Sequence, residues 1–203
     1  MQRVFYRDKD WKVEEGIDLH RLRELLKASH PCLWVDLEGE PPEALEAVAR
    51  EFSLHPVTIE DLVHRNQRPK LEEFDGYIFI VAHGLRSIQG EEVVTDEFNV
   101  AVGENWILSA HDGHVEAMKR VYDQVVAAPK ASDGGPSFIL YRISDLLVDS
   151  YFPALDALED EIDALEDDVV QRPTQGRLPQ IFALKQVLVH LRKLVSPQRE
   201  VYN

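Results

Sequence analysis

The densest group of side chains able to do chemistry is acidic and lies in the last third of the chain. Residues 145–168 contain ten carboxylates and no lysine or arginine. The ten are Asp145, Asp149, Asp156, Glu159, Asp160, Glu161, Asp163, Glu166, Asp167 and Asp168. Such a density of carboxylates attracts divalent cations, which are hard ions that prefer oxygen ligands. The simpler interpretation is a solvated acidic helix paired with a basic neighbour, and the pattern leaves both open.

Other reactive residue types do not combine into a catalytic set. His111 and His114 are spaced as metal ligands can be, but they lack a glutamate base and a third ligand, which favours a surface loop. The glycine pair at 134–135 follows no strand and indicates a hinge, not a phosphate cradle. Cys32 opens an apolar stretch and is expected to pack in the core. We therefore predict no catalytic residue and no enzyme.

Composition narrows the class of protein further. The chain has 203 residues, with 22 lysines and arginines against 37 aspartates and glutamates, which gives a net charge of −15. A nucleic-acid partner is not expected, because binding a polyphosphate requires a basic face. One cysteine excludes an intramolecular disulfide, and 44% hydrophobic residues predict a folded chain. The N-terminus lacks the apolar core of a secretory signal, and the longest apolar windows fall far short of the ~20 residues that span a bilayer.

The first part of the chain alternates between strand and helix patterns. β-Branched and aromatic residues predict strands over residues 4–6, 33–37, 77–85, 93–102 and 106–109. Helices are predicted over residues 18–28 after an Asp18 cap, 41–52, 58–64 after a Thr58 cap, and from 112 or 113 to 126. The short connection at 103–105 suits a hairpin, so the sheet is expected to be mixed. The fold class is therefore α/β.

The second part is helical. The segment PKASDGGP at 129–136 is the best candidate boundary in the chain, which gives an α/β domain over 1–128, a linker over 129–136 and a helical region over 137–203. Beyond it, apolar residues recur in steps of 4 and 3 on both sides of the breaker RPTQG at 172–176. Such seams are typical of a coiled coil, so we expect a long antiparallel helical hairpin. Pro153 is expected to kink the first helix or to mark its restart.

Several separated motifs together resemble one known family. The strings WVDLE from Trp34, FSLHPVTIED from Phe52 and QRPKLEEFDGYIFI from Gln67 look like the cytosolic domain of CorA-type magnesium transporters. The strings LYRISDLLVDSYF from Leu140 and EID from Glu161 are similar to the acidic helix pair of the same family. The resemblance covers residues 31 to 202 in the order and spacing of the family. Because the motifs agree with one another, the match is more specific than any single motif.

The resemblance implies a fold and a function. Members of the family are funnel-shaped homopentamers with an α/β/α sandwich, an acidic helix pair, a long stalk helix and two membrane spans joined by a loop that carries a Gly-Met-Asn signature. This sequence contains neither stalk, spans nor signature. We therefore expect the N-terminal cytosolic part of a plasma-membrane transporter. The expected cargo is Mg²⁺, with Co²⁺ and Ni²⁺ as further candidates, and the chain would reach the membrane only through segments outside this sequence.

The resemblance also implies a regulatory metal site. Glu60 and Asp61 match the acidic pair of the short helix after His-Pro, and Asp145 matches an acidic position near the start of the first long helix. In the family these carboxylates face an aspartate on the stalk of the neighbouring subunit, and a weakly bound regulatory Mg²⁺ stabilises the closed channel. From spacing alone, Glu60 and Asp61 would merely favour the N-terminal end of a helix opened by Thr58.

Two other functions remain open at this point. A departure from Gly-Met-Asn in the pore loop would favour the related zinc transporter (ZntB-like) branch. A coiled-coil hairpin that binds another protein is a scaffold alternative. A soluble metal-dependent enzyme is disfavoured, because no acid is matched with a base or a nucleophile.

Overall fold

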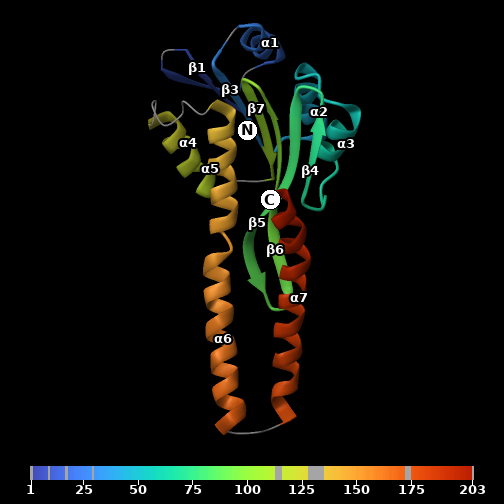
Figure 1. Ribbon diagram of the computed structural model, residues 1–203, viewed down its shortest axis with the longest axis vertical. Coiled ribbons are helices and arrows are strands. Elements are labelled where there is room, and N and C mark those ends of the chain that lie inside the picture. The colour runs from blue at the N-terminus through green and yellow to red at the C-terminus, as the bar shows by residue number, and fades with distance from the viewer. Residues whose placement is uncertain are drawn as a thin grey trace.

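The structure is a computed structural model that describes residues 2–8, 10–16, 18–28, 30–112, 116–127, 135–171 and 175–202. The strands are β1 (Gln2–Arg7), β2 (Trp11–Glu15), β3 (Cys32–Glu38), β4 (Lys70–Phe74), β5 (Tyr77–Gln89), β6 (Glu92–Gly103) and β7 (Trp106–His111). The helices are α1 (Leu19–Lys27), α2 (Pro42–Glu51), α3 (Pro56–Val63), α4 (Glu116–Ala127), α5 (Gly135–Asp149), α6 (Phe152–Gln171), the 3₁₀ turn η2 (Gln175–Arg177) and α7 (Leu178–Val201). Figure 1 shows their arrangement.

One mixed sheet organises the upper part of the molecule. Its strand order is β2-β1-β3-β7-β6-β5-β4, and the β3–β7 pair is parallel while the other pairs are antiparallel. The expected hairpin at residues 103–105 joins β6 to β7. The central strands are buried on both faces, and successive side chains enter opposite cores, as the period of two in a strand requires.

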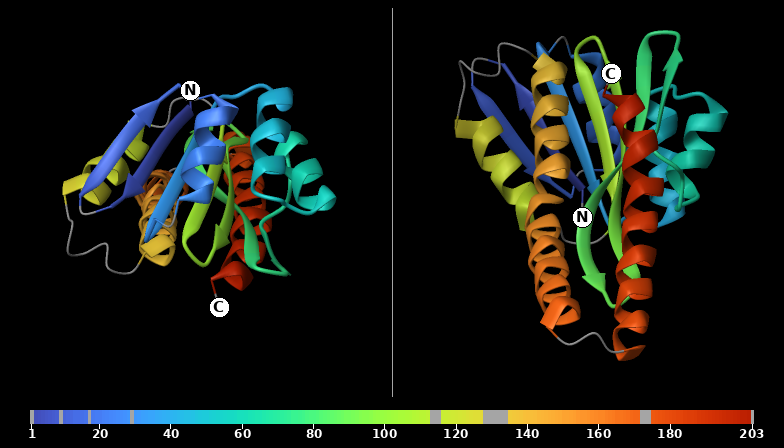
Figure 2. Two further views of the ribbon diagram at one scale, coloured as in Figure 1. Left: turned by 90° about the horizontal axis from the view of Figure 1, so that it is seen from above. Right: turned by 60° about the horizontal axis from the view of Figure 1, so that its bottom comes forward.

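Helices cover both faces of this sheet (Figure 2). On one face, the helices α1, α2 and α3 pack against alternate strand residues such as Leu33, Val35 and Leu37. On the other face, α4 and α5 pack against Trp34, Ile107 and their neighbours. The predicted α/β/α sandwich is therefore confirmed.

The boundary predicted at 129–136 lies only partly within the described residues. Residues 129–134 fall outside them, and Gly135 and Pro136 form the start of α5. Helix α5 packs on the sheet beside α4, so the first helix after the breaker contributes to the core of the sandwich. The division of the chain into 1–128 and 137–203 stays a prediction.

The helical hairpin is present, but its two arms do not form the predicted seam. The helical conformation is interrupted at Ser150 and Tyr151, between α5 and α6. Pro153 lies in the first turn of α6, so it marks the restart of the helix, as predicted. The extended tip of the β5–β6 hairpin lies between α6 and α7 (Figures 1 and 2). The buried cluster there joins Leu85 of β5 to Leu158 of α6 and to Leu184 of α7. Alternate seam residues are consequently exposed, namely Leu155, Ile162, Ile181, Leu188 and Val195.

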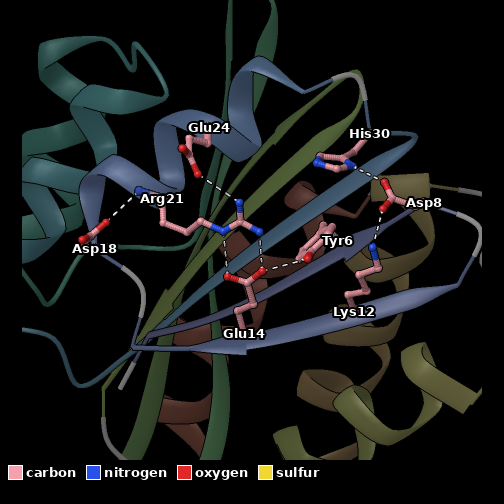
Figure 3. A network of polar contacts seen from close by, with 8 residues as sticks. All are labelled: Tyr6, Asp8, Lys12, Glu14, Asp18, Arg21, Glu24 and His30. Atoms are coloured by element: carbon pink, nitrogen blue, oxygen red, sulfur yellow. Dashed lines mark hydrogen bonds and ion pairs between the residues drawn. The ribbon is translucent and has the colours of Figure 1, made fainter.

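The N-terminal edge of the sandwich is fastened by a polar network (Figure 3). Asp18 caps α1 by accepting a hydrogen bond from the Arg21 amide at 2.8 Å, as predicted. The Arg21 guanidinium donates to both oxygens of Glu14 at 2.7 and 3.0 Å, which ties α1 to β2. This ion pair lowers the pKa of Glu14 to about 2. The network joins α1 to β2 at the surface of the sandwich, and we assign it a structural role.

A carboxylate is buried at the centre of the sheet. Asp36 of β3 is 0% exposed and accepts hydrogen bonds from the hydroxyls of Ser109 at 2.5 Å and Tyr122 at 2.6 Å. The fully buried His111 ring lies 3.4 Å from the same carboxylate. Burial raises the pKa of Asp36, but the contacts with His111, Ser109 and Tyr122 lower it more, so that it lies below the ordinary 3.8. Asp36 thus connects β3, β7 and α4 from within the core.

Within the described part of the chain, no helix combines the length and the apolarity that a bilayer crossing requires.

The Asp36→Ala variant is expected to lower the free energy of unfolding by about 3 kcal/mol, because the Ser109 and Tyr122 hydroxyls lose their acceptor and the buried His111 ring loses the neighbouring carboxylate. Urea unfolding measures this, with Asp123→Ala on the exposed face of α4 as the control expected to change stability by less than about 0.5 kcal/mol. Because the pKa of Asp36 is lowered, its contribution is fully present above about pH 4 and is lost as the pH falls further. Equal stability of the two variants would contradict this role of Asp36.

Candidate metal-binding carboxylates

The helix that carries Glu60 and Asp61 begins earlier than predicted. His55 is the N-cap of α3, with its Nδ1 accepting from the Val57 amide at 3.3 Å, and Pro56 occupies the first turn. Thr58 is therefore not the cap. Thr58 lies within the helix, its side chain is fully buried, and its hydroxyl is 2.9 Å from the Tyr77 hydroxyl. Glu60 and Asp61 consequently lie in the second half of α3, where attraction to the N-terminal helix dipole does not explain them.

Asp61 is 8% exposed and already has a cation as its partner. The Nζ of Lys70 on β4 lies 2.7 Å from Asp61 Oδ2 and 3.1 Å from Glu72 Oε1. Burial lowers the pKa of Lys70, but the two carboxylates outweigh this effect, so the pKa is raised overall. A metal ion that binds Asp61 must therefore displace Lys70 or share the Asp61 carboxylate with it.

Glu60, by contrast, is exposed on the same helix. Its side chain forms no ion pair with any residue that the structure describes. It borders a shallow pocket of about 300 Å³ between α2 and α3, in which Arg50 is paired with Glu46 at 2.5 Å. Glu60 is thus the member of the acidic pair that is free to accept an external cation.

Asp145 lies on α5, on a different surface. Its carboxylate is 3.3 Å from Arg142 Nη1, one helical turn away, and remains 40% exposed. The surrounding pocket of about 250 Å³ is lined by two arginines, Arg120 and Arg142, and by a second acid, Asp149. The local charge is therefore balanced, and Asp145 alone does not create a strongly negative site.

The structure separates the predicted site residues into two groups. Glu60 and Asp61 belong to α3 on one face of the sheet, and Asp145 belongs to α5 on the other face (Figure 2). Among the described residues, no three histidine, cysteine, aspartate or glutamate side chains converge closely enough to hold a metal ion. The described part of the chain thus places the predicted carboxylates on two separate surfaces.

The remaining candidates differ in their surroundings. In the acidic run, the carboxylates of α6 from Asp156 to Asp167 are solvent-exposed, and the described ion pair between the arms joins Arg177 to Asp168.

His111 is not in a surface loop as predicted: it ends β7, is fully buried and stacks on Phe98, because the strand extends two residues further than its pattern indicated. His114 and Gly134 lie outside the described residues. Burial raises the pKa of Cys32 to about 12, which agrees with a packing role.

Comparison with known proteins identifies the family. Residues 30–203 match the family described as CorA-like Mg²⁺ transporter protein. The chain belongs to this family. It is 31% identical over 203 residues to the cobalt/magnesium transport protein CorA of Thermotoga maritima, covering 97% of this chain and 56% of that relative. It is 34% identical over 169 residues to YfjQ of Bacillus subtilis, covering 83% of this chain and 52% of the relative. The chain thus spans about half the length of these curated relatives.

Solved structures agree on the fold. The soluble domain of CorA from Methanocaldococcus jannaschii aligns with a TM-score of 0.74 at 19% identity, over 99% of this chain and 77% of that one. The cytoplasmic domain of ZntB from Vibrio parahaemolyticus aligns with a TM-score of 0.70 at 16% identity, over 98% of this chain and 75% of that one. At these identities the likeness concerns the fold. The members of the CorA family named here are transport proteins, not enzymes.

The Lys70→Met variant is expected to lose about 2 kcal/mol of stability in metal-free buffer, because Asp61 and Glu72 lose the cation between them. The same change leaves two carboxylates around a position that a hydrated Mg²⁺ can occupy, so Mg²⁺ should raise the melting temperature of this variant more than that of the wild type. Thermal unfolding by circular dichroism measures both effects.

Two controls accompany this measurement. Lys185→Met removes an exposed lysine of α7 and should leave the response to Mg²⁺ unchanged. Lys70→Met combined with Asp61→Asn should abolish the additional response. An identical Mg²⁺ shift in all variants would show that the Asp61 carboxylate does not accept the metal.

Proposed function

We propose that this chain is the cytosolic metal-sensing domain of a CorA-type divalent cation transporter in the plasma membrane, with Mg²⁺ as the cargo and Co²⁺ and Ni²⁺ as further candidates. Membership of the family over residues 30–203 supports the transporter role. The observation that carries the sensing role is the placement of the candidate carboxylates on two opposite faces of one subunit.

Candidate carboxylates on opposite faces of one subunit suit a ring of identical subunits. In a head-to-tail ring, one face of each subunit contacts the opposite face of the next, and the same contact repeats until the ring closes. The α3 side of one copy would then lie against the α5 side of its neighbour, so that Glu60 and Asp61 approach a neighbour's Asp145. The homopentamer expected from the family resemblance is one such ring.

Regulation follows from the charges that such an interface brings together. Two carboxylates 4 Å apart repel each other by about 4 kcal/mol at an effective dielectric constant of about 20. A bound Mg²⁺ removes this repulsion and stabilises the closed ring, and its loss favours an open arrangement. High cytosolic Mg²⁺ would thereby stop further uptake.

The ion pairs within each subunit set the strength of this site. Lys70 and Arg142 already compensate Asp61 and Asp145, so that Mg²⁺ competes with a resident cation at both sides. Mg²⁺ also keeps several of its waters and takes only one or two carboxylates in most protein sites. The site is consequently weak and reversible, as a sensor of abundant cytosolic Mg²⁺ has to be.

A zinc transporter is the second candidate. The chain is 26% identical over 179 residues to the zinc transport protein ZntB of Yersinia pseudotuberculosis, and the ZntB domain named above has a similar fold. Sequencing the gene beyond the codon for Asn203 would test both candidates. Two apolar stretches of ~20 residues would support a transporter. A Gly-Met-Asn between them would favour Mg²⁺, and a departure from it would favour zinc.

Complementary variants test the head-to-tail interface. The variant Glu60→Gln/Asp61→Asn lacks the α3 side, and Asp145→Asn lacks the α5 side. At high protein concentration with Mg²⁺, we expect wild type to associate progressively and each variant alone to stay monomeric. An equimolar mixture restores one interface between two copies and should stop at a heterodimer in sedimentation velocity. Association that is equal in all four samples, or unaffected by EDTA, would exclude these carboxylates from the interface.

The regulatory role is tested in the full-length transporter. Asp61→Asn combined with Asp145→Asn weakens metal binding and relieves the repulsion at the same time. We expect this double variant to lose most of its Mg²⁺-dependent protection from protease and to take up Mg²⁺ with little dependence on the cytosolic concentration. Asp123→Asn on α4 serves as the control. Protection and feedback that match the wild type would remove Asp61 and Asp145 from the sensor.

A further inference from the structure

A pocket whose lining includes none of the candidate carboxylates has the opposite charge. It has a volume of about 580 Å³ and lies between the loop after α3, the strands β5 and β6, and the C-terminal half of α7. Its polar lining consists of Gln67, Arg68, His83, Thr95, His190 and Lys193, and none of the lining residues is an aspartate or glutamate. In a chain of net charge −15, a cavity with two cations and no acid is a local reversal of charge.

The two cations are available to a ligand. Arg68 comes from the loop and Lys193 from α7, and both side chains are exposed. Neither forms an ion pair with any residue in the part of the chain that the structure describes, whereas Arg86 on the neighbouring strand is paired with Asp96. A guanidinium and an ammonium that line one cavity are groups that bind phosphate oxygens, the first by a planar fork and the second as a point charge.

The base of the pocket is rigid. His83 is 6% exposed, and its Nε2 donates to the Gln67 carbonyl at 2.9 Å. A carbonyl only accepts, so Nε2 carries a hydrogen, and Nδ1 faces the Thr95 hydroxyl at 3.4 Å. The side chain of Gln198 holds the backbone of His83 from α7, accepting from its amide at 2.7 Å and donating to its carbonyl at 2.9 Å.

One buried acid, Glu97, lies beside this base. Glu97 lies opposite His83 in the β5–β6 ladder, and its two oxygens accept hydrogen bonds from the Gln67 amide and the Asn99 side chain, both at 2.9 Å. It is 7% exposed and does not line the cavity. Glu97 therefore binds the backbone of the loop that carries Arg68, and its carboxylate lies outside the lining of the cavity.

Apolar residues complete the walls. Pro69, Val93, Leu194 and Pro197 line the same cavity and offer flat surfaces on which a ring can pack. A volume of about 580 Å³ is in the range of small-molecule sites and exceeds what an inorganic ion requires. We propose that this pocket binds a small organic phosphate of nucleotide size, with the phosphates between Arg68 and Lys193 and the organic part against the apolar wall. The proposal is independent of the metal-sensing function.

Calorimetric titration of the chain with four probes tests the proposal in buffer free of divalent cations. ATP and AMP are expected to bind, inorganic phosphate to bind at least about tenfold more weakly than ATP, and adenosine not to bind measurably. In the variant Arg68→Gln/Lys193→Met, ATP affinity should fall about tenfold or more, because charge-assisted hydrogen bonds are lost. Leu194→Ala should weaken ATP more than inorganic phosphate.

Matched controls keep the result decisive. Lys185→Met removes an exposed lysine of the same helix outside the pocket and should leave ATP affinity unchanged. Melting temperatures of all variants verify that they fold. The proposal is overturned if wild type fails to bind ATP, if Arg68→Gln/Lys193→Met binds it as tightly as Lys185→Met does, or if inorganic phosphate binds as tightly as ATP. Self-association that is lost in Arg68→Gln/Lys193→Met, without nucleotide binding, would assign the pocket to an acidic segment of a second copy instead.

Discussion

Burial of the sheet on both faces is the constraint on which the rest of the structure depends. The strands β3, β5, β6 and β7 present apolar side chains to a core on each side, so charged groups are restricted to helices, loops and strand ends. The exceptions include Asp96 and Glu97 of β6 and the fully buried Asp36, which is tolerated because two hydroxyls and the His111 ring surround its carboxylate. Because α3 and α5 cover different faces, the carboxylates they carry are held apart by the thickness of the sheet.

The partly buried candidate carboxylates on the two helix layers each have a cation partner within the same chain. The partner is Lys70 for Asp61 and Arg142 for Asp145. A buried carboxylate without such a partner would cost several kcal/mol. A metal ion that binds these carboxylates would therefore compete with Lys70 and Arg142, and this competition lowers its affinity.

The sequence pattern predicted most of the sandwich and missed elements whose residues are mainly charged. The strands β2 and β4 escaped prediction because WKVEE and KLEEF are rich in charge, which is common in edge strands that must avoid further pairing. The missed strand β4 matters for the site, since it supplies Lys70. The motif around His55 placed Glu60 and Asp61 on a short helix, but the pairing of Asp61 depends on how α3 packs beside β4, and no local pattern encodes that contact.

The same limit applies to the helical hairpin. Its heptad-like spacing predicts two helices that pack on each other, and the spacing is real, yet the partner of each helix is the tip of the β5–β6 hairpin. These strands have 13 and 12 residues, longer than their apolar patterns indicated, and the additional length separates α6 from α7. A periodic apolar pattern thus specifies that a helix face is buried without specifying by what.

Helix α7 contacts both the region of the acidic helix α6 and the pocket that contains Arg68 and Lys193. Its N-terminal half packs with α6 around the β5–β6 tip, and its C-terminal half is held to β5 by the paired hydrogen bonds between Gln198 and the backbone of His83. His83 is also at the base of the pocket that contains Arg68, and Lys193 and Pro197 of α7 line that pocket.

An anion bound in this pocket would contact both the sheet and α7, and would therefore favour the arrangement in which α7 is docked on the sheet. By reciprocity, a force that shifts α7 relative to the sheet must change the affinity of the pocket by the same free energy. The acidic arm α6 is joined to α7 through η2 and the Arg177–Asp168 ion pair, which makes α7 the element through which events at the arms and at the sheet can affect each other.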